Sequence, residues 1–296
     1  MYVSVIMKQL IFMLFLLYLL PNYAQGPIDG YLKGKGNLDV AIGMNFSRAN
    51  EYYGVNNQSF DIPYSVEMLS VFAQYGITDK IDGVFSLPFI FGKEEKKFQD
   101  LGLHLKYKPI EFNFSNGANW SQLISAGFSF PASDYRPDVT GALGQRAKRI
   151  PLRFISQLKF ENGLFFNFTG AYHFRLDEIS QETAAMVLEE NPDFNLRPPA
   201  NHYSIVGRVG LATSKHFIEV FTEYQKTLGG VDYEEGVVKP SQLYGVDFLK
   251  VGGTYYFGMD ENGIAVNASY IPALRRNIGN IFSVGISFII KHYSKK

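Results

Sequence analysis

Hydrophobic and polar residues alternate along most of this chain, in segments of about ten residues that end at Gly, Pro, Asn or Asp. Residues 37 to 47 show the pattern well, because one alternate set is apolar and the other is polar or small. The apolar set is Leu38, Val40, Ile42, Met44 and Phe46. Successive side chains of a strand point to opposite faces, so this pattern predicts a strand with one face toward lipid and the other toward a polar interior.

The same alternation predicts about twelve strands, and an even number returns the C-terminus to the side of the N-terminus, as bacterial single-chain barrels require. The expected strands lie near 37–47, 64–76, 80–91, 99–109, 120–131, 150–160, 164–175, 202–213, 216–227, 247–257, 263–272 and 280–290.

Loop lengths support this order, because short and long connections alternate, as they do between the two sides of an outer-membrane barrel. The expected periplasmic links are 77–79, 110–119, 161–163, 214–215 and 258–262, and the expected outer loops are 48–63, 92–98, 132–149, 176–201, 228–246 and 273–279. A short helix is expected near 182–190. The fold class is therefore all-β, a membrane-spanning antiparallel up-and-down β-barrel. A soluble β-sandwich is the alternative, and it would bury one face of each sheet against the other.

The N-terminus has the order of a secretory signal. Lys8 precedes an apolar run at residues 10–20, followed by Pro21 and the small residues Ala24 and Gly26. The alternative, a membrane-spanning helix, needs roughly 20 apolar residues. We expect a signal peptide at 1–24, a periplasmic segment at 25–36, a barrel at 37–290 and a short periplasmic tail at 291–296. This organisation predicts the outer membrane of a Gram-negative bacterium as the location.

Composition narrows the possible functions. Aromatic residues make up 16% of the chain, with 26 Phe and 19 Tyr, as is typical of barrels with aromatic girdles. The net charge of +0 gives no general attraction to nucleic acid, and we expect none as a partner. The absence of Cys excludes disulfides, Cys-ligated metals and a lipid anchor. The sequence has no metal-ligand spacing, Walker loop or dinucleotide fingerprint, and we expect no cofactor.

The last strand carries a signal of its own. Ser283, Gly285, Phe288 and Ile290 resemble the C-terminal pattern read by the outer-membrane insertion machinery. We therefore expect that machinery and outer-membrane lipid as partners. Residues 291–296 depart from the pattern, because many such proteins stop at a terminal aromatic residue.

Three stretches resemble the putative outer-membrane proteins associated with the meta-pathway of phenol degradation. They are YGITDKIDGVFSLP at 75–88, LGLHLKYK at 101–108 and ISAGFSFP at 124–131. Ala132 and Ser133 replace the usual Thr-Gly, and Gln99 and Asp100 stand where glycines are common. The resemblance implies a barrel and passage of small hydrophobic or aromatic compounds, although it consists of strand and turn motifs and identifies no site residue.

Strand parity predicts which charged side chains face the interior. The candidate lumen-lining residues are Asp39, Asp82, His104, Lys106, Arg153, His173, Arg208, Glu219, Glu223 and Lys250, together with the polar residues Asn45, Gln157, Asn167, Thr254 and Asn267. Across the turn at 214–215, Arg208 is expected opposite Phe221 and diagonal to Glu219 and Glu223. The set is either a ladder of compensating charges or a constriction that selects solutes.

The sequence does not predict an enzyme. A lipid-facing hydrolase needs a Ser beside a His on the outer face, whereas His104 and His173 are expected to point inward. A protease site at the outer rim would use residues such as Asp134, Asp138 and His173, but loop carboxylates are common. The loop at 132–149 is basic, through Arg136, Arg146, Lys148 and Arg149. If it folds inward it favours anionic solutes, and otherwise it is a surface loop.

These observations give two main hypotheses. The first is a passive channel or facilitator for small solutes. The second is a non-conducting structural or adhesion barrel, closed by its own side chains, whose loops are the working surface. An outer-membrane hydrolase is a third hypothesis.

Overall fold

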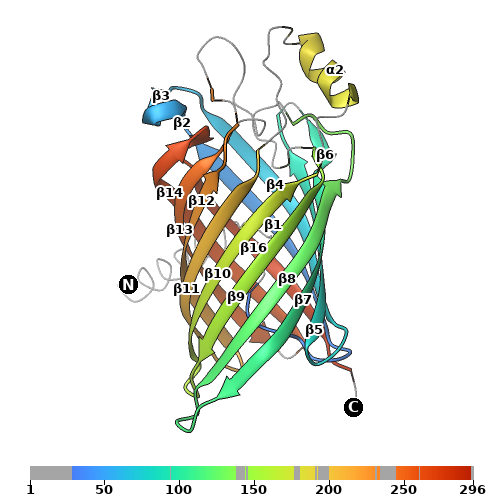
Figure 1. Ribbon diagram of the computed structural model, residues 1–296, viewed down its shortest axis with the longest axis vertical. Coiled ribbons are helices and arrows are strands. Elements are labelled where there is room, and N and C mark those ends of the chain that lie inside the picture. The colour runs from blue at the N-terminus through green and yellow to red at the C-terminus, as the bar shows by residue number, and fades with distance from the viewer. Residues whose placement is uncertain are drawn as a thin grey trace, which may run out of the picture.

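The computed structural model describes residues 29–93, 95–137, 144, 146–176, 181–190, 192, 200–230, 232–233, 245–259 and 261–294. Within these residues, twelve long antiparallel strands form a tall barrel (Figure 1). They are β1 (Leu38–Ala49), β4 (Tyr64–Gly76), β5 (Ile81–Phe91), β7 (Asp100–Asn113), β8 (Asn119–Pro131), β9 (Arg149–Lys159), β10 (Leu164–Arg175), β11 (His202–Ala212), β12 (His216–Thr227), β13 (Asp247–Met259), β14 (Asn262–Arg276) and β16 (Phe282–His292).

The barrel closes where the first strand meets the last. β1 pairs with β4 on one side and with β16 on the other, in a register that runs from Leu38 opposite His292 to Arg48 opposite Phe282. Closure leaves no long strand with an unpaired edge, which a structure in lipid requires because the hydrocarbon offers backbone groups no hydrogen bonds. The prediction of a closed twelve-stranded antiparallel barrel is confirmed.

Several strands run past their expected ends, and β7 is one of them, because the sequence pattern ends it near residue 109. β7 continues to Asn113, and its pairing with β8 shifts register between Tyr107 and Ile110. Pro109 lies in this shift. Proline has no N–H to donate to a ladder, so it is tolerated where the pairing is already interrupted. The strand then resumes beyond the irregularity.

The two ends of the barrel differ. Short turns join the strands at one end, which we call the turn end, and long connections join them at the other, which we call the loop end (Figure 1). The loop end carries a helix, α2 (Gln181–Glu190), where a helix near 182–190 was expected, and the three-residue β6 (Lys96–Phe98). It also carries a 3-10 turn (Val55–Asn57) and a small sheet of β2 (Tyr52–Tyr53), β3 (Ser59–Phe60) and β15 (Ile278–Gly279). Alternating short and long connections follow the predicted order.

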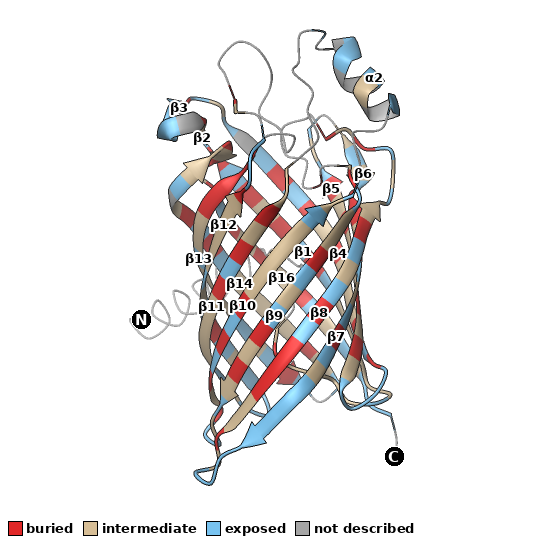
Figure 2. Ribbon diagram, in the orientation of Figure 1, coloured by how far each residue is buried: buried red, intermediate tan, exposed pale blue. Residues whose placement is uncertain are grey.

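Side-chain burial alternates along the strands (Figure 2). On the outer face, Leu105 is 57% exposed and Val220 is 58% exposed, although both are large and apolar. On the inner face, polar residues such as Asn45, Ser70 and Gln157 are buried. A soluble protein would show the opposite arrangement.

Among the described residues, no helix is long and apolar enough to cross a membrane. The expected signal peptide at 1–24 and residues 25–28 lie outside the described residues. β16 continues to His292, two residues past the expected end of the last strand.

A small apolar core lies at the loop end. Ala49, Val246, Phe248, Ile271 and Ile281 are buried together there. These residues sit at the ends of β1, β13 and β14 and just before β16, so the cluster fixes the four strands beside the seam against one another.

Candidate functional site

The barrel encloses a cavity of about 440 Å³. Inward-facing side chains from nine strands line it, and they include cations, carboxylates, three histidines and several apolar groups. The size falls in the range of sites for small molecules, roughly 300–1,000 Å³. We treat this cavity as the candidate functional site.

The structure divides the sequence-predicted residues into two groups. The first group lines the cavity and consists of His104, Arg153, His173, Arg208, Glu219, Glu223 and Lys250. The second group lies near the turn end, where an N-terminal segment contacts it, and consists of Asp39, Asp82 and Lys106.

Opposite charges face each other across β11, β12 and β13. Arg208 lies directly opposite Phe221, in the expected register, and its Nε is 3.9 Å from Glu219 Oε2. The same guanidinium donates from Nη1 to Asn167 Oδ1 at 3.0 Å. Glu223 and Lys250, which are direct partners on neighbouring strands, form an ion pair. On this wall the charges therefore compensate one another.

The neighbouring strands β9 and β10 carry mainly cations toward the loop end. Arg149 and Arg175 are direct partners on β9 and β10, and Arg153 lies four residues after Arg149 on the same face. We call Arg149, Arg153 and Arg175 the arginine cluster. Arg149 Nη2 is 3.0 Å from Asp100 Oδ2. Sequence reasoning missed the inward placement of Arg149 and Arg175, because it assigned the first to a loop and the second to a strand end.

Three histidines accompany the arginine cluster. His173 and His202 are direct partners on β10 and β11, and their rings stack with centroids 4.2 Å apart. His104 Nδ1 is 3.2 Å from Arg153 Nη1. His202 was also missed in the sequence, although it shares the strand parity of Arg208 and could have been found from it.

The loop after β8 folds into the mouth of the barrel. Tyr135 has no exposed surface, and its hydroxyl donates to Asp100 while accepting from the backbone N–H of Arg146. Burial, and then the neighbouring Asp100 carboxylate, raises the pKa of Tyr135 well above its usual value, so its hydroxyl stays protonated. Gly144 borders a smaller hollow of about 110 Å³ beside Arg149. Of the two alternatives from the sequence, the described part of this loop follows the inward one.

The N-terminal segment (Asp29–Asn37) lies inside the turn end of the barrel. Lys106, which has no exposed surface, donates to the Tyr31 carbonyl at 2.6 Å and pairs with Asp29 at 3.2 Å. Gln74 donates to the same carbonyl at 3.0 Å, and the Lys33 backbone N–H donates to Asp82 at 2.8 Å. These contacts fix the segment to β4, β5 and β7.

The same segment reaches the other side of the barrel. The Tyr31 ring makes edge contacts with Phe165 of β10 at 5.7 Å and Phe217 of β12 at 6.1 Å between centroids. Six strands lie between β4 and β12 in one direction around the barrel and four in the other. The segment therefore bridges nearly opposite walls and narrows the lumen at the turn end.

Gly76 makes room for this segment. A Cβ at Gly76 would lie 1.8 Å from the Gly34 carbonyl oxygen, and the two backbones are linked through Gly36, whose N–H donates to the Gly76 carbonyl at 2.7 Å. A hairpin turn alone would explain a glycine here from the sequence. In the structure the reason is instead the close approach of a second backbone.

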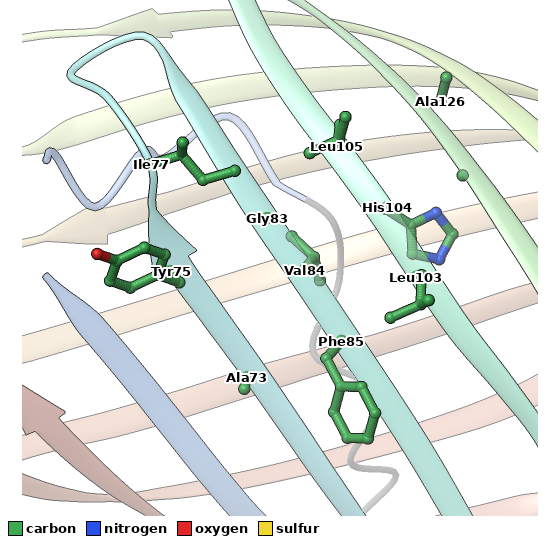
Figure 3. A pocket seen from close by; sticks show the side chains of 11 residues that line it. Ala73, Tyr75, Ile77, Gly83, Val84, Phe85, Leu103, His104, Leu105 and Ala126 are labelled. Atoms are coloured by element: carbon green, nitrogen blue, oxygen red, sulfur yellow. The ribbon is translucent and has the colours of Figure 1, made fainter. Parts of the chain in front are cut away.

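A second hollow, of about 600 Å³, lies on the outer wall (Figure 3). The small residues Ala73, Gly83 and Ala126 leave it open between larger apolar neighbours on β4, β5 and β7. Those neighbours include Tyr75, Phe85 and Leu103, which Figure 3 labels. Its lining is mostly apolar, and Tyr75, Phe85 and Leu103 face outward, so lipid chains fit it better than a polar solute.

Within the described residues, no group of three or more His, Asp or Glu side chains is arranged to hold a metal ion. The contacts of His104 and His173 are with Arg153 and His202, rather than with a serine hydroxyl. Asp138, one residue of the expected protease alternative, lies outside the described residues.

Comparison with known proteins gives structural neighbours only. No family model matches this chain, and no curated protein resembles it significantly in sequence. The COG4313 outer membrane channel from Pseudomonas putida F1 has a similar structure, with a TM-score of 0.65 and 13% identity over 92% of this chain and 100% of that one. The NanC porin (TM-score 0.48, 10% identity, 88% of this chain and 100% of that one) and the KdgM porin (0.44, 8%, 86% and 99%) are more distant. The chain has the fold of an outer-membrane channel.

Proposed function

We propose that this chain is a channel in the outer membrane of a Gram-negative bacterium, through which small solutes diffuse passively. The observation that carries the proposal is the charged cavity inside a closed barrel whose outer face is apolar. Charged rings along a pore set which solutes enter and leave it. In this setting lipid surrounds the barrel, the turn end faces the periplasm, and the insertion machinery recognises β16.

The family resemblance of the sequence supports a finer version of the proposal, in which the solutes are small hydrophobic or aromatic compounds. Met68, Phe72 and Val84 support it as well, since these inward-facing apolar side chains line the cavity beside the charges. A purely hydrophilic pore would have no reason to keep them there.

A non-conducting barrel is the second candidate, and the N-terminal segment favours it. The segment bridges nearly opposite walls and is held by buried groups of β4, β5 and β7. A barrel closed in this way would work through its loops. The two candidates differ in one measurable property, which is whether the lumen of the full chain admits solutes with this segment in place.

Liposome swelling tests the proposal directly. Purified chain would be reconstituted with and without residues 29–36, and swelling would be followed with sugars, amino acids and aromatic acids. We expect slow swelling with the full chain and faster swelling with the deletion. Arg208→Ala is expected to change ion selectivity in planar bilayers, while the lipid-facing Ile205→Ala on the same strand leaves it unchanged. A deleted chain that folds but admits no solute would rule out a channel.

A further inference from the structure

The arginine cluster holds more positive charge than the described part of the chain neutralises. Three guanidinium groups face one carboxylate, Asp100, which already pairs with Arg149 and accepts from Tyr135. Arg153 contacts the ring of His104. The three guanidinium nitrogens of Arg175 are buried and, among the described residues, have no hydrogen-bond partner.

This arrangement is unfavourable in an empty barrel. Arg149 and Arg175 are directly opposite on neighbouring strands, and like charges in such positions repel. Buried cations are normally paired, and a buried donor without an acceptor loses its hydration without compensation. The nearby strands β12 and β13 of the same lumen show the usual solution, since Glu223 lies opposite Lys250 there.

An anion in the cavity would supply the missing charge and acceptors. Arg149, Arg153, His104 and His173 line both the main cavity and the adjoining smaller hollow, so their side chains converge on one space. A guanidinium group presents parallel N–H donors that match the two oxygens of a carboxylate. Arg175 is the direct partner of Arg149 on β10 and adds to the positive potential, although it does not itself line the cavity or the smaller hollow.

The surroundings of the cluster indicate what the anion is attached to. Val84 is the direct partner of His104 on β5, and Met68 and Phe72 of β4 line the same cavity. Apolar groups therefore lie beside the cationic wall. We propose that this lumen contains a binding site for a small organic acid, with its carboxylate against Arg149 and Arg153 and its apolar part against Phe72 and Val84. The inference rests on the proposed channel function and names the class of its solute.

Binding is measured separately from conduction, by titration calorimetry on the folded protein in detergent micelles. The probes are acetate, butyrate and the neutral butyramide. We expect butyrate to bind more tightly than acetate and butyramide not to bind. Arg153→Gln should weaken butyrate binding by roughly tenfold or more, because it removes a charge-assisted hydrogen bond. Arg153→Lys, which keeps the charge and loses the paired donors, should bind butyrate with an affinity between those of the wild type and Arg153→Gln.

Lys108→Gln is the matched control, since it removes one cation that pairs with the exposed Glu111 and does not line the cavity. It should change butyrate binding by less than about threefold. Failure of butyrate to bind the wild-type chain, or equal effects of Arg153→Gln and Lys108→Gln, would overturn the site. Binding of inorganic phosphate without binding of butyrate would also overturn it. Binding without liposome swelling would leave the site standing and contradict the channel instead.

Discussion

Lys106 is the residue on which the turn end most depends. Its side chain has no exposed surface, and its ammonium group contacts Asp29 and the Tyr31 carbonyl. A lysine so buried is stable only while its donors are occupied, because dehydrating an ammonium ion is expensive. The N-terminal segment thus provides a carboxylate and a carbonyl oxygen for the Lys106 ammonium group, and these contacts in turn fix the segment in the barrel.

Replacing Lys106 by Met is expected to lower the free energy of unfolding by about 3–5 kcal/mol, because it leaves Asp29 without its partner inside the barrel. Urea unfolding followed by the fluorescence of Trp120 would measure this. Lys108→Met is the control, since Lys108 pairs with the exposed Glu111 near the turn end. That variant should change stability by about 1 kcal/mol or less. Equal losses in the two variants would contradict the special role of Lys106.

The N-terminal segment also packs against the hairpin that β4 and β5 form. Gly76 lies at the end of β4 against the Gly34 carbonyl, whereas a Cβ at Gly83, on β5, would meet only the end of Ile77 at 3.5 Å. The two glycines are thus close in the fold but differ in what an added methyl group would meet.

Gly76→Ala is therefore expected to displace the N-terminal segment and raise the conductance of single channels in planar bilayers. The backbone shift should also cost about 1–3 kcal/mol of stability. Gly83→Ala should leave the conductance unchanged, because its methyl group points outward. If both variants conduct like the wild type, this contact does not hold the segment in the lumen.

An element could be predicted from the sequence where the residues that determine it lie within one short segment. The strands near 64–76, 164–175 and 216–227 were found at their observed bounds, because alternation along one segment defines a strand of a barrel. The continuation of β7 past Pro109 was not found, since it depends on pairing with β8. The contacts of the N-terminal segment were likewise not predictable, because its partners are distant in the sequence, as with Tyr31 and Phe217, which are 186 residues apart.

The candidate site likewise has a part that could be predicted from the sequence and a part that could not. Parity placed Arg208 opposite Phe221, because the tight turn at 214–215 fixes the register between β11 and β12. Arg149 and Arg175 were missed because they lie at strand ends next to longer loops. There the alternation of the sequence no longer shows which face a residue is on. That these two residues face each other is a property of β9 and β10 together.

At the scale of the whole molecule, the outer face determines where the protein resides. Large apolar side chains such as Leu105, Val220 and Phe282 are half-exposed around the barrel, while the polar groups point inward. A surface of this kind is covered only by lipid or detergent.

The purified chain is therefore expected to remain dispersed only in detergent or lipid. Analytical ultracentrifugation before and after removal of detergent would measure this, with aggregation as the expected result. A folded monomer that persists in plain buffer would contradict the membrane-spanning barrel and everything inferred about its lumen.

The position of the N-terminal segment also restricts the order in which the molecule can be assembled. The segment immediately precedes β1, yet Phe165 and Phe217, which receive Tyr31, belong to strands that are synthesised much later. Contacts between such distant parts of a chain form slowly, because a large loop must close first. The earliest described residues of the polypeptide are thus among the last to find their place. We therefore expect the lumen to be filled late in folding, as we expect for the pairing of β1 with β16.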